Sequence, residues 1–134
     1  MCKIDDEKKK LIWKKARIVD GYDSDKYRQD ACGAWIVYDD YQNRDSVYGW
    51  EVDHVYPMSK LKSFGVEQNE IDDVRNLRPL NWKNNVSKGA DYPSYRAVCI
   101  ADGNRNTETE KELIVNQDVQ KVIKDLFKDY NIRW

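Results

Sequence analysis

The spacing of apolar and polar positions changes along the chain, and each spacing predicts a different element. In residues 5–19 the segment DDEKKKLIWKKARIV begins with acids and ends with bases before Gly21, which predicts a helix aligned with its own dipole. The next segment, DSDKYRQDACG, predicts a short helix that Asp23 or Ser24 caps and that ends at Gly33. We therefore expect two helices before the first strand.

The middle of the chain has the spacing of strands. Residues 34–38 and 48–54 are rich in aromatic and β-branched side chains, and they predict a hairpin across a polar loop. Residues 57–73 show no clear period and are expected to be irregular. After them, VRNLRPL predicts a strand and NWKNNVSKG predicts a short helix that ends at Gly89. The expected order is strand, loop, strand, helix.

The last third of the chain predicts a second hairpin and an amphipathic helix. SYRAVCIAD and KELIVN flank the turn GNRNTE, and residues 117–130 follow with Asn116 as a helix cap. One stripe of this helix is apolar, and we expect it to face the core: Val119, Val122, Ile123, Leu126, Phe127 and Tyr130.

Composition and charge narrow the class of protein. The 134 residues suffice for one core and are too few for two comfortable domains, and the 40% hydrophobic content with 5 Trp and 9 Tyr predicts a folded globular chain. A net charge of -1 argues against binding nucleic acid with the whole surface. Residues 74–90 contain no acid, however, and carry four bases: Arg75, Arg78, Lys83 and Lys88.

No stretch approaches the roughly 18 apolar residues of a membrane span, and the charged N-terminus does not suit a signal peptide. We therefore expect a cytoplasmic protein that does not enter a membrane. The cysteines Cys2, Cys32 and Cys99 are odd in number and widely spaced, and they form no CxxC pair. Buried or inert thiols are expected rather than disulfides or a zinc knuckle.

The stretch GWEVDHVYP holds the single histidine of the chain. A lone histidine is usually structural, but His54 follows Asp53 at the end of a predicted strand, where a rigid scaffold commonly presents reactive groups. A neutral imidazole at this place can accept a proton from water. Downstream, NLRPLNWKNNVSKG places Asn76 before a strand and Asn85 in a helix. Taken alone, Asn76 is equally suited to forming a turn.

Together, VDHVYP and NLRPLNWKNNVSKG closely resemble the HNH endonuclease motif in its Asp-His, Asn, Asn-x-x-Lys form. The resemblance covers about residues 33–92. It implies an α+β fold with a ββα-metal core, flanked here by N-terminal helices, an extra β-hairpin and a C-terminal amphipathic helix. Many relatives build a zinc ribbon from CxxC pairs that this chain lacks. We therefore expect one HNH nuclease domain over residues 1–134, without structural zinc.

The resemblance also implies roles for individual residues. Asp53 and Asn85 are the implied metal ligands, His54 the general base, and Asn76 the residue that braces the loop carrying His54. A carboxylate and an amide oxygen suit one hard divalent cation, with Mg²⁺ favoured over Mn²⁺ or another divalent ion. We expect the second ring nitrogen of His54 to donate to a backbone carbonyl.

The expected activity is metal-dependent hydrolysis of phosphodiester bonds in DNA. Lys88 and Arg78 lie nearest the implied ligands in sequence and are the first candidates for phosphate contacts, with Lys83 and Arg75 behind them. The modest net charge favours recruitment by a protein partner. Two alternatives stay open: a catalytically silent HNH-fold module that binds nucleic acid or protein, and a nuclease acting mainly on RNA.

Overall fold

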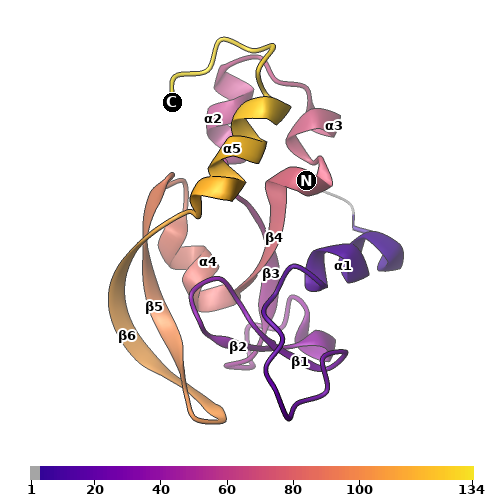
Figure 1. The fold of residues 1–134 in the computed structure, drawn as a ribbon, viewed down its shortest axis with the longest axis vertical. Helices are drawn as coiled ribbons and strands as arrows, with labels where there is room; N and C mark the ends of the chain where they lie inside the picture. The colour runs from indigo at the N-terminus through magenta and orange to yellow at the C-terminus, as the bar shows by residue number, and fades with distance from the viewer. Residues whose placement is uncertain (1–3) are drawn as a thin grey trace.

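A computed structural model describes residues 4–134 as a mixed α+β chain with five α-helices and three small antiparallel sheets (Figure 1). In chain order the elements are α1 (Asp6–Trp13), β1 (Tyr27–Gln29), β2 (Trp35–Val37), η1 (Tyr38–Asp40), β3 (Trp50–His54), α2 (Met58–Ser63), α3 (Gln68–Ile71), η2 (Val74–Asn76), β4 (Leu77–Asn81), α4 (Trp82–Lys88), β5 (Ser94–Asp102), β6 (Arg105–Ile114) and α5 (Gln117–Leu126). Helices α2, α3 and α5 gather at one end, and the β5–β6 hairpin runs along one side.

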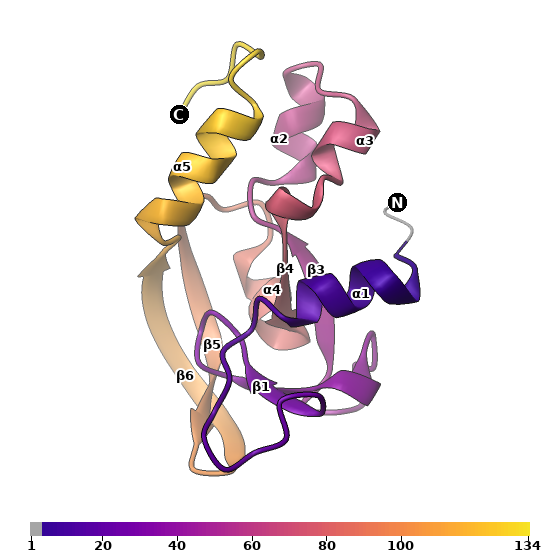
Figure 2. The ribbon, with the colours of Figure 1, turned by 45° about the vertical axis from the view of Figure 1, so that its right-hand side comes forward.

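A two-stranded sheet and a helix occupy the middle of the molecule (Figure 2). Strands β3 and β4 pair in antiparallel fashion, with His54 opposite Leu77. Helix α4 follows β4 directly, because the side chain of Asn81 accepts a hydrogen bond of 3.0 Å from the backbone N–H of Lys83 and so caps the helix. The helix ends at Gly89, whose φ of 51° favours glycine. The predicted strand and helix on either side of Asn81 are confirmed.

The predicted pairing of residues 34–38 with residues 48–54 is wrong. Both segments contain strands, but β2 pairs with β1, and β3 pairs with β4. The segment expected as a second short helix instead supplies β1. Its turn into β2 is closed by the side chain of Asp30, which accepts hydrogen bonds from the backbone N–H groups of Cys32 (3.0 Å) and Ala34 (2.8 Å). A local side-chain acceptor thus favours the turn over a helix.

Two further predictions need correction near the N-terminus and after β3. Helix α1 begins as expected, with Asp5 as its cap, but it ends at Trp13 rather than near residue 19. The chain then leaves the helix because Arg17 forms a bridge with Gln29 of β1. Residues 57–73 are not irregular, since they contain α2 and α3. Each of these short helices buries an apolar residue in the core, which stabilises it in the folded chain.

The C-terminal third follows the sequence pattern closely. Strands β5 and β6 form the predicted hairpin, but β6 begins at Arg105, inside the segment predicted as the turn. Helix α5 begins after Asn116, whose side chain accepts from the N–H of Asp118 at 2.7 Å. Ile123 and Phe127 are fully buried, as predicted. Val122 is 43% exposed, however, so this member of the predicted stripe does not face the core. The helix also ends earlier than predicted, at Leu126.

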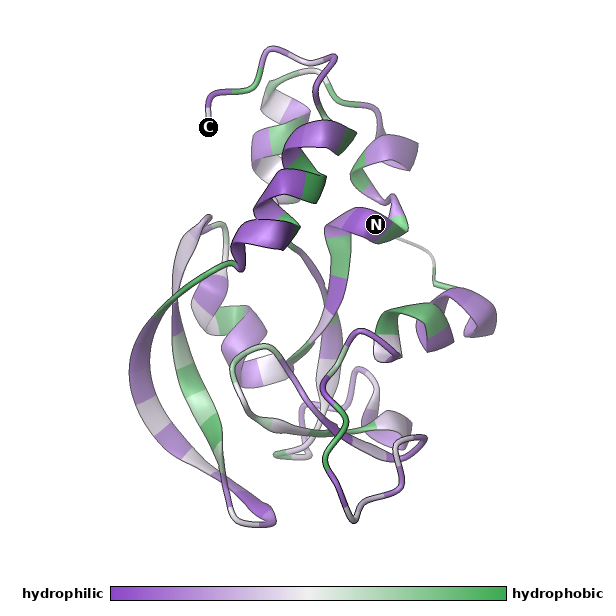
Figure 3. Cartoon of the chain, viewed as in Figure 1, coloured by the Kyte–Doolittle hydropathy of each residue, from purple (hydrophilic) through white to green (hydrophobic). Residues whose placement is uncertain are grey.

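The buried apolar side chains form two clusters. One packs α1 against β2, β3 and β4, and the other lies among α2, α3, β5 and α5. Figure 3 shows that apolar residues concentrate in the middle of β5 while β6 is mostly hydrophilic, so β5 carries the packing of this hairpin. Cys32 and Cys99 are buried free thiols, as expected, and Cys2 lies outside the described residues. Within residues 4–134, none of the helices is long and apolar enough to cross a membrane.

Candidate functional site

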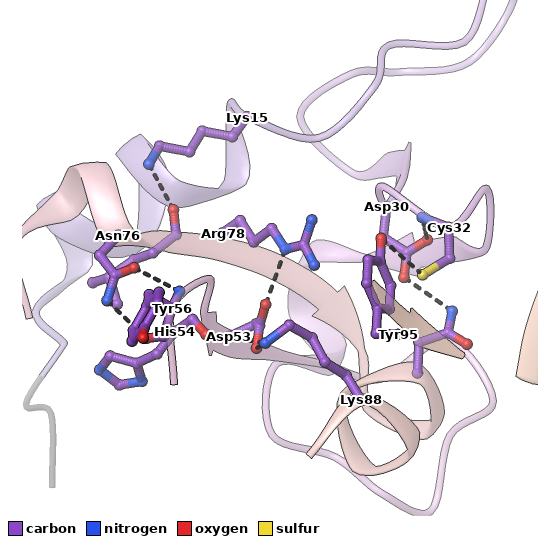
Figure 4. Close-up of polar contacts among 12 residues, drawn as sticks. Lys15, Asp30, Cys32, Asp53, His54, Tyr56, Asn76, Arg78, Lys88 and Tyr95 are labelled. Atoms are coloured by element: carbon purple, nitrogen blue, oxygen red, sulfur yellow. Dashed lines mark hydrogen bonds and ion pairs between the residues drawn. The ribbon is translucent and has the colours of Figure 1, made fainter. Parts of the chain in front are cut away.

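The carboxylate of Asp53 lies at the centre of a buried charge cluster between β3, β4 and α4 (Figure 4). Asp53 faces Arg78 across the two strands, and Arg78 Nε donates to its Oδ2 at 2.9 Å. Lys88 Nζ, from the last residue of α4, lies 3.2 Å from its Oδ1. Asp53 is 4% exposed and Lys88 is fully buried. One carboxylate is therefore shared by two cations inside the protein.

The two cations respond differently to this environment. Burial lowers the pKa of Lys88 more than the neighbouring Asp53 raises it. Lys88 Nζ also donates a hydrogen bond to the backbone oxygen of His54 at 3.2 Å. Burial likewise lowers the pKa of Arg78, but Asp53 and Tyr95 outweigh it and raise the pKa above its usual value. Within residues 4–134, the Arg78 Nη2 atom is buried without a hydrogen-bond partner. With two basic side chains, Arg78 and Lys88, around one carboxylate, the cluster contains more basic than acidic groups.

Asn85 lies one turn before Lys88 on the same helix, and it contacts a different carboxylate. Its Nδ2 donates to Oε1 of Glu51 at 3.0 Å, and Arg44 holds the same carboxylate through Nε (2.7 Å) and Nη2 (3.0 Å). Burial raises the pKa of Glu51, but the bonds from Arg44 and Asn85 lower it below its usual value. Glu51 and Asp53 are two residues apart on β3 and so share one face. Asp53 and Asn85 therefore border the same β3–α4 interface without bonding each other.

Glu51 is a site residue that the sequence reasoning did not identify. Its signal is the Glu-x-Asp spacing, which places two carboxylates on one face of a strand.

His54, the last residue of β3, contacts Asp72. Its Nε2 lies 2.7 Å from Asp72 Oδ1, and Gln68 donates to the other carboxylate oxygen at 2.9 Å. Figure 4 shows the imidazole directed away from the Asp53 carboxylate, as expected for neighbours in a strand. The predicted backbone-carbonyl partner is therefore replaced by a carboxylate. Because a carboxylate only accepts, Nε2 carries the hydrogen, and Nδ1 is the acceptor in the neutral ring.

Asp72 is another site residue that the sequence did not reveal, because it lies in the segment expected to be irregular. Burial raises its pKa, but the hydrogen bonds from His54 and Gln68 outweigh this effect and lower the pKa below its usual value. Lys8 of α1 also donates to its backbone oxygen at 2.8 Å. The side chain of Asp72 is held by Gln68 and its backbone oxygen by Lys8, so Asp72 can hold the ring of His54 in one orientation.

Asn76 fixes the chain immediately after His54. Its fully buried side chain accepts from the backbone N–H of Tyr56 at 2.8 Å and donates to the backbone oxygens of Tyr56 (3.2 Å) and Ile71 (3.1 Å). Its own backbone oxygen accepts from the N–H of Val55 at 2.8 Å. This is the geometry expected of a residue that braces the loop after the histidine.

The four bases predicted to contact phosphates do not form one surface. Lys88 is fully buried against the Asp53 carboxylate, and Arg78 pairs with the same carboxylate and is only 12% exposed. Arg75 is exposed but pairs with Asp73 through two hydrogen bonds of 3.0 Å. Lys83 is partly exposed on α4. Burial and the ion pairs with Asp53 thus limit the access of Arg78 and Lys88 to solvent, and their phosphate contacts stay a prediction.

A second polar cluster fixes the start of α4. The buried carboxylate of Asp30 accepts from the backbone N–H of Asn81 (2.9 Å) and from Asn84 Nδ2 (3.2 Å), in addition to the N–H groups in the β1–β2 turn. Asn84 in turn accepts from the N–H of Cys99 at 2.9 Å, which ties α4 to β5. Burial raises the pKa of Asp30 more than its hydrogen bonds lower it. Asp30 was not predicted, because its partners are distant in sequence.

Among the described residues, no group of three or more His, Cys, Asp or Glu side chains is placed to hold a metal ion. A set made of one carboxylate and one amide, as predicted here, is not a group of that kind. In comparisons with known proteins, no family model matches the chain, and neither a curated protein nor a solved structure matches it.

Proposed function

We propose that the chain is a metal-dependent endonuclease of the HNH type that hydrolyses phosphodiester bonds of DNA, with β3, β4 and α4 as a ββα-metal core. One observation carries the proposal: the face of α4 that bears Asn85 packs on the face of β3 that bears Asp53. Lys88, one turn beyond Asn85, reaches Asp53 at 3.2 Å. The two residues that resemble HNH metal ligands therefore come from elements in direct contact.

The oxygen donors at this interface fit one divalent cation, Mg²⁺ or Mn²⁺. The Asp53 carboxylate and the Asn85 amide oxygen would hold it, with Glu51 as a further carboxylate on the same strand face. Asp53 already pairs with two cations, Arg78 and Lys88, so a divalent cation would compete with them for the carboxylate oxygens. Binding requires that the ammonium of Lys88 leave the carboxylate. When bound, the ion would stabilise negative charge on the phosphate undergoing hydrolysis.

His54 would act as the general base. Asp72 holds its Nε2–H at 2.7 Å and leaves the lone pair on Nδ1 to accept a proton from water. General-base catalysis of this kind typically contributes about 10²- to 10⁴-fold in rate. Asn76 keeps the adjoining loop in place through its bonds to Tyr56. The proposed base is thus oriented from one side by a carboxylate and supported from the other by an amide.

A catalytically silent binding module of the same fold is the second candidate. It is favoured by the pairing of both Asp53 oxygens with cations, because a carboxylate that neutralises Arg78 and Lys88 has a structural role without any metal. In either case the net charge of -1 supports recruitment by a protein partner rather than strong binding to DNA through the whole surface.

Cleavage of supercoiled plasmid in Mg²⁺ or Mn²⁺ tests the proposal. The wild type should convert plasmid to nicked or linear product, and His54→Ala should lose at least about 100-fold in rate while keeping its circular dichroism spectrum. Asn69→Ala, an exposed change on α3, is the matched control and should cleave normally. Single-stranded DNA and structured RNA in parallel reactions identify the preferred substrate.

Two outcomes would contradict the nuclease proposal. A folded wild type that cleaves nothing in either metal would favour the silent module. Equal cleavage by wild type and His54→Ala would remove His54 from the reaction.

A further inference from the structure

A cavity of about 580 Å³ lies where α2, the chain before β5 and the C-terminal segment meet. Its volume falls within the range of roughly 300–1,000 Å³ that is usual for small-molecule sites. The side chains lining it are mostly of two kinds, aromatic and basic, and the principal ones are Tyr56, Tyr92, Trp134, Lys60, Lys124 and Arg133. This combination differs from that of the charge cluster at Asp53.

Three aromatic rings of the lining are packed together, with that of Tyr56 between the other two. The ring of Tyr56 lies 4.8 Å from that of Tyr92 and 5.4 Å from that of Trp134, measured between centroids. Trp134 is 51% exposed, so much of its face is open to a ligand. Within residues 4–134, the hydroxyl of Tyr92 is buried and lacks a hydrogen-bond partner, and burial raises its pKa to about 12. Tyr92 thus lines the cavity, while its hydroxyl is a buried polar group without a partner.

The charged side chains that line the cavity all have the same sign. Lys60, Lys124 and Arg133 line it, none of its lining residues is acidic, and no ion pair engages these three bases in the described part of the chain. The ammonium of Lys124 lies 6.0 Å from the centroid of the Trp134 ring. A ligand that carries both an anionic group and a flat aromatic ring would satisfy the whole lining.

The cavity also lies close to the proposed general base. Tyr56 follows His54 by two residues, so at most about 7 Å of chain separates their Cα atoms. Asn76 holds the backbone of Tyr56 on both its N–H and its oxygen. A strand bound in the cavity could therefore continue toward His54.

We propose that this cavity binds a nucleotide of a single-stranded nucleic acid, with the base stacked on Trp134 and Tyr92 and the phosphate near Lys60, Lys124 and Arg133. Positively charged grooves with exposed aromatic rings are the usual means of holding unpaired strands, and a duplex keeps its bases stacked internally. Binding of the strand stands on the cavity alone, whereas its role as the substrate of His54 rests on the proposed nuclease function.

Binding of fluorescein-labelled dT12 and rU12, measured by fluorescence anisotropy in EDTA, tests the proposal without cleavage. An abasic strand of equal length supplies the same phosphates without bases, and a duplex supplies paired bases. At least one single strand should bind more tightly than the abasic strand and the duplex. Trp134→Ala should weaken that binding by about 5- to 150-fold, the range for one stacked base, and leave abasic binding unchanged.

Three further variants separate the contribution of the Trp134 ring to binding from that of the Lys124 charge. Trp134→Phe should restore most of the affinity, because it restores the ring. Lys124→Ala should weaken binding of every strand, whereas Lys128→Ala, an exposed base paired with Asp125 outside the cavity lining, should have little effect.

The binding readout is independent of the proposed chemistry, because EDTA removes the divalent cation on which the proposed cleavage depends. A wild type that cleaves nothing in Mg²⁺ or Mn²⁺ but binds single strands through Trp134 would overturn the nuclease proposal alone. Equal affinity for dT12, rU12 and the abasic strand, or unchanged binding by Trp134→Ala, would overturn the nucleotide site. Displacement of the labelled strand by polyglutamate, if it required Lys124 but not Trp134, would also overturn the nucleotide site. It would assign the cavity to an acidic protein segment.

Discussion

At the scale of single residues, the site depends on how the charge of Asp53 is balanced. A buried carboxylate is tolerated only when cations or donors compensate it, and here Arg78 and Lys88 both do so. Lys88 therefore compensates the charge of Asp53 in the folded chain, and in the proposed nuclease it would compete with the divalent cation for the same oxygen. Arg78 alone would still compensate the carboxylate if Lys88 were removed.

Replacing Lys88 by Met should strengthen binding of Mn²⁺. Two unit charges about 4 Å apart attract by roughly 4 kcal/mol near a protein surface, and the incoming ion would no longer have to displace the ammonium. We expect at least about a tenfold gain in affinity, which corresponds to ~1.4 kcal/mol, by isothermal titration calorimetry. Lys83→Met, on the same helix but away from Asp53, should bind as the wild type does. Equal or weaker binding by Lys88→Met would contradict competition at Asp53.

Asp72 should make stability depend on pH. Its pKa is lowered in the folded chain, so its ionised form stabilises the fold above the ordinary Asp value near ~3.9, and this stabilisation is lost as pH falls through the lowered pKa. Asp72→Asn should therefore cost about 1–3 kcal/mol of unfolding free energy at pH 7. The difference from wild type should shrink as pH falls below ~4.

Urea unfolding between pH 7 and pH 3 measures this difference, with the exposed Asp129→Asn as control. A difference that stays constant across the range would show that the charge of Asp72 is not what stabilises its contact with His54.

At the scale of elements, the helix after β4 was predictable because its signals are local. Asn81 caps α4 and Gly89 ends it, and both are visible in the sequence. Strand pairing was not predictable in the same way. Residues 34–38 and 48–54 are neighbours in the chain, yet β3 pairs with β4, which begins more than 20 residues later, because pairing depends on long-range packing. Helices α2 and α3 were not predicted for the same reason, because long-range burial in the core is what stabilises them.

In the candidate site, too, the sequence predicts the residues themselves but not their long-range partners. Asp53, His54, Asn76 and Asn85 could be named from a motif, because residue type and spacing are enough to recognise one. Their partners depend on strand register and on the course of the loop after β3, which spacing does not determine. The exchange of a predicted carbonyl for Asp72 is one consequence, and the inward position of two predicted phosphate contacts is another.

The loop between β3 and α2 should depend strongly on Asn76. Asn76→Ala would leave the N–H and oxygen of Tyr56 and the oxygen of Ile71 without their buried partner, and an unsatisfied buried group costs about 1–3 kcal/mol. We expect a loss of about 2–4 kcal/mol in unfolding free energy by urea titration. Asn69→Ala, exposed on α3, should change it by less than about 0.5 kcal/mol. A similarly small effect for Asn76→Ala would contradict its bracing role.

At the scale of the whole molecule, affinity for nucleic acid should come from local charge. The 23 bases and 24 acids nearly cancel, whereas the cavity between α2 and α5 is lined by three bases and no acid. Three phosphate contacts on a single strand predict a slope of about -2 in a plot of log affinity against log salt concentration. Anisotropy titrations with dT12 between 50 and 200 mM NaCl measure this slope, and a value near zero would contradict phosphate binding.

The proposed nuclease site requires that Asp53 and Asn85 hold one divalent cation. A crystal structure of the protein soaked with Mn²⁺, with anomalous scattering measured to locate the ion, tests this most directly. We expect one anomalous peak bound by Asp53 and Asn85, with the ammonium of Lys88 displaced from the carboxylate. A Mn²⁺-soaked crystal without a peak at this interface, in which Asp53 still pairs with both Lys88 and Arg78, would contradict it.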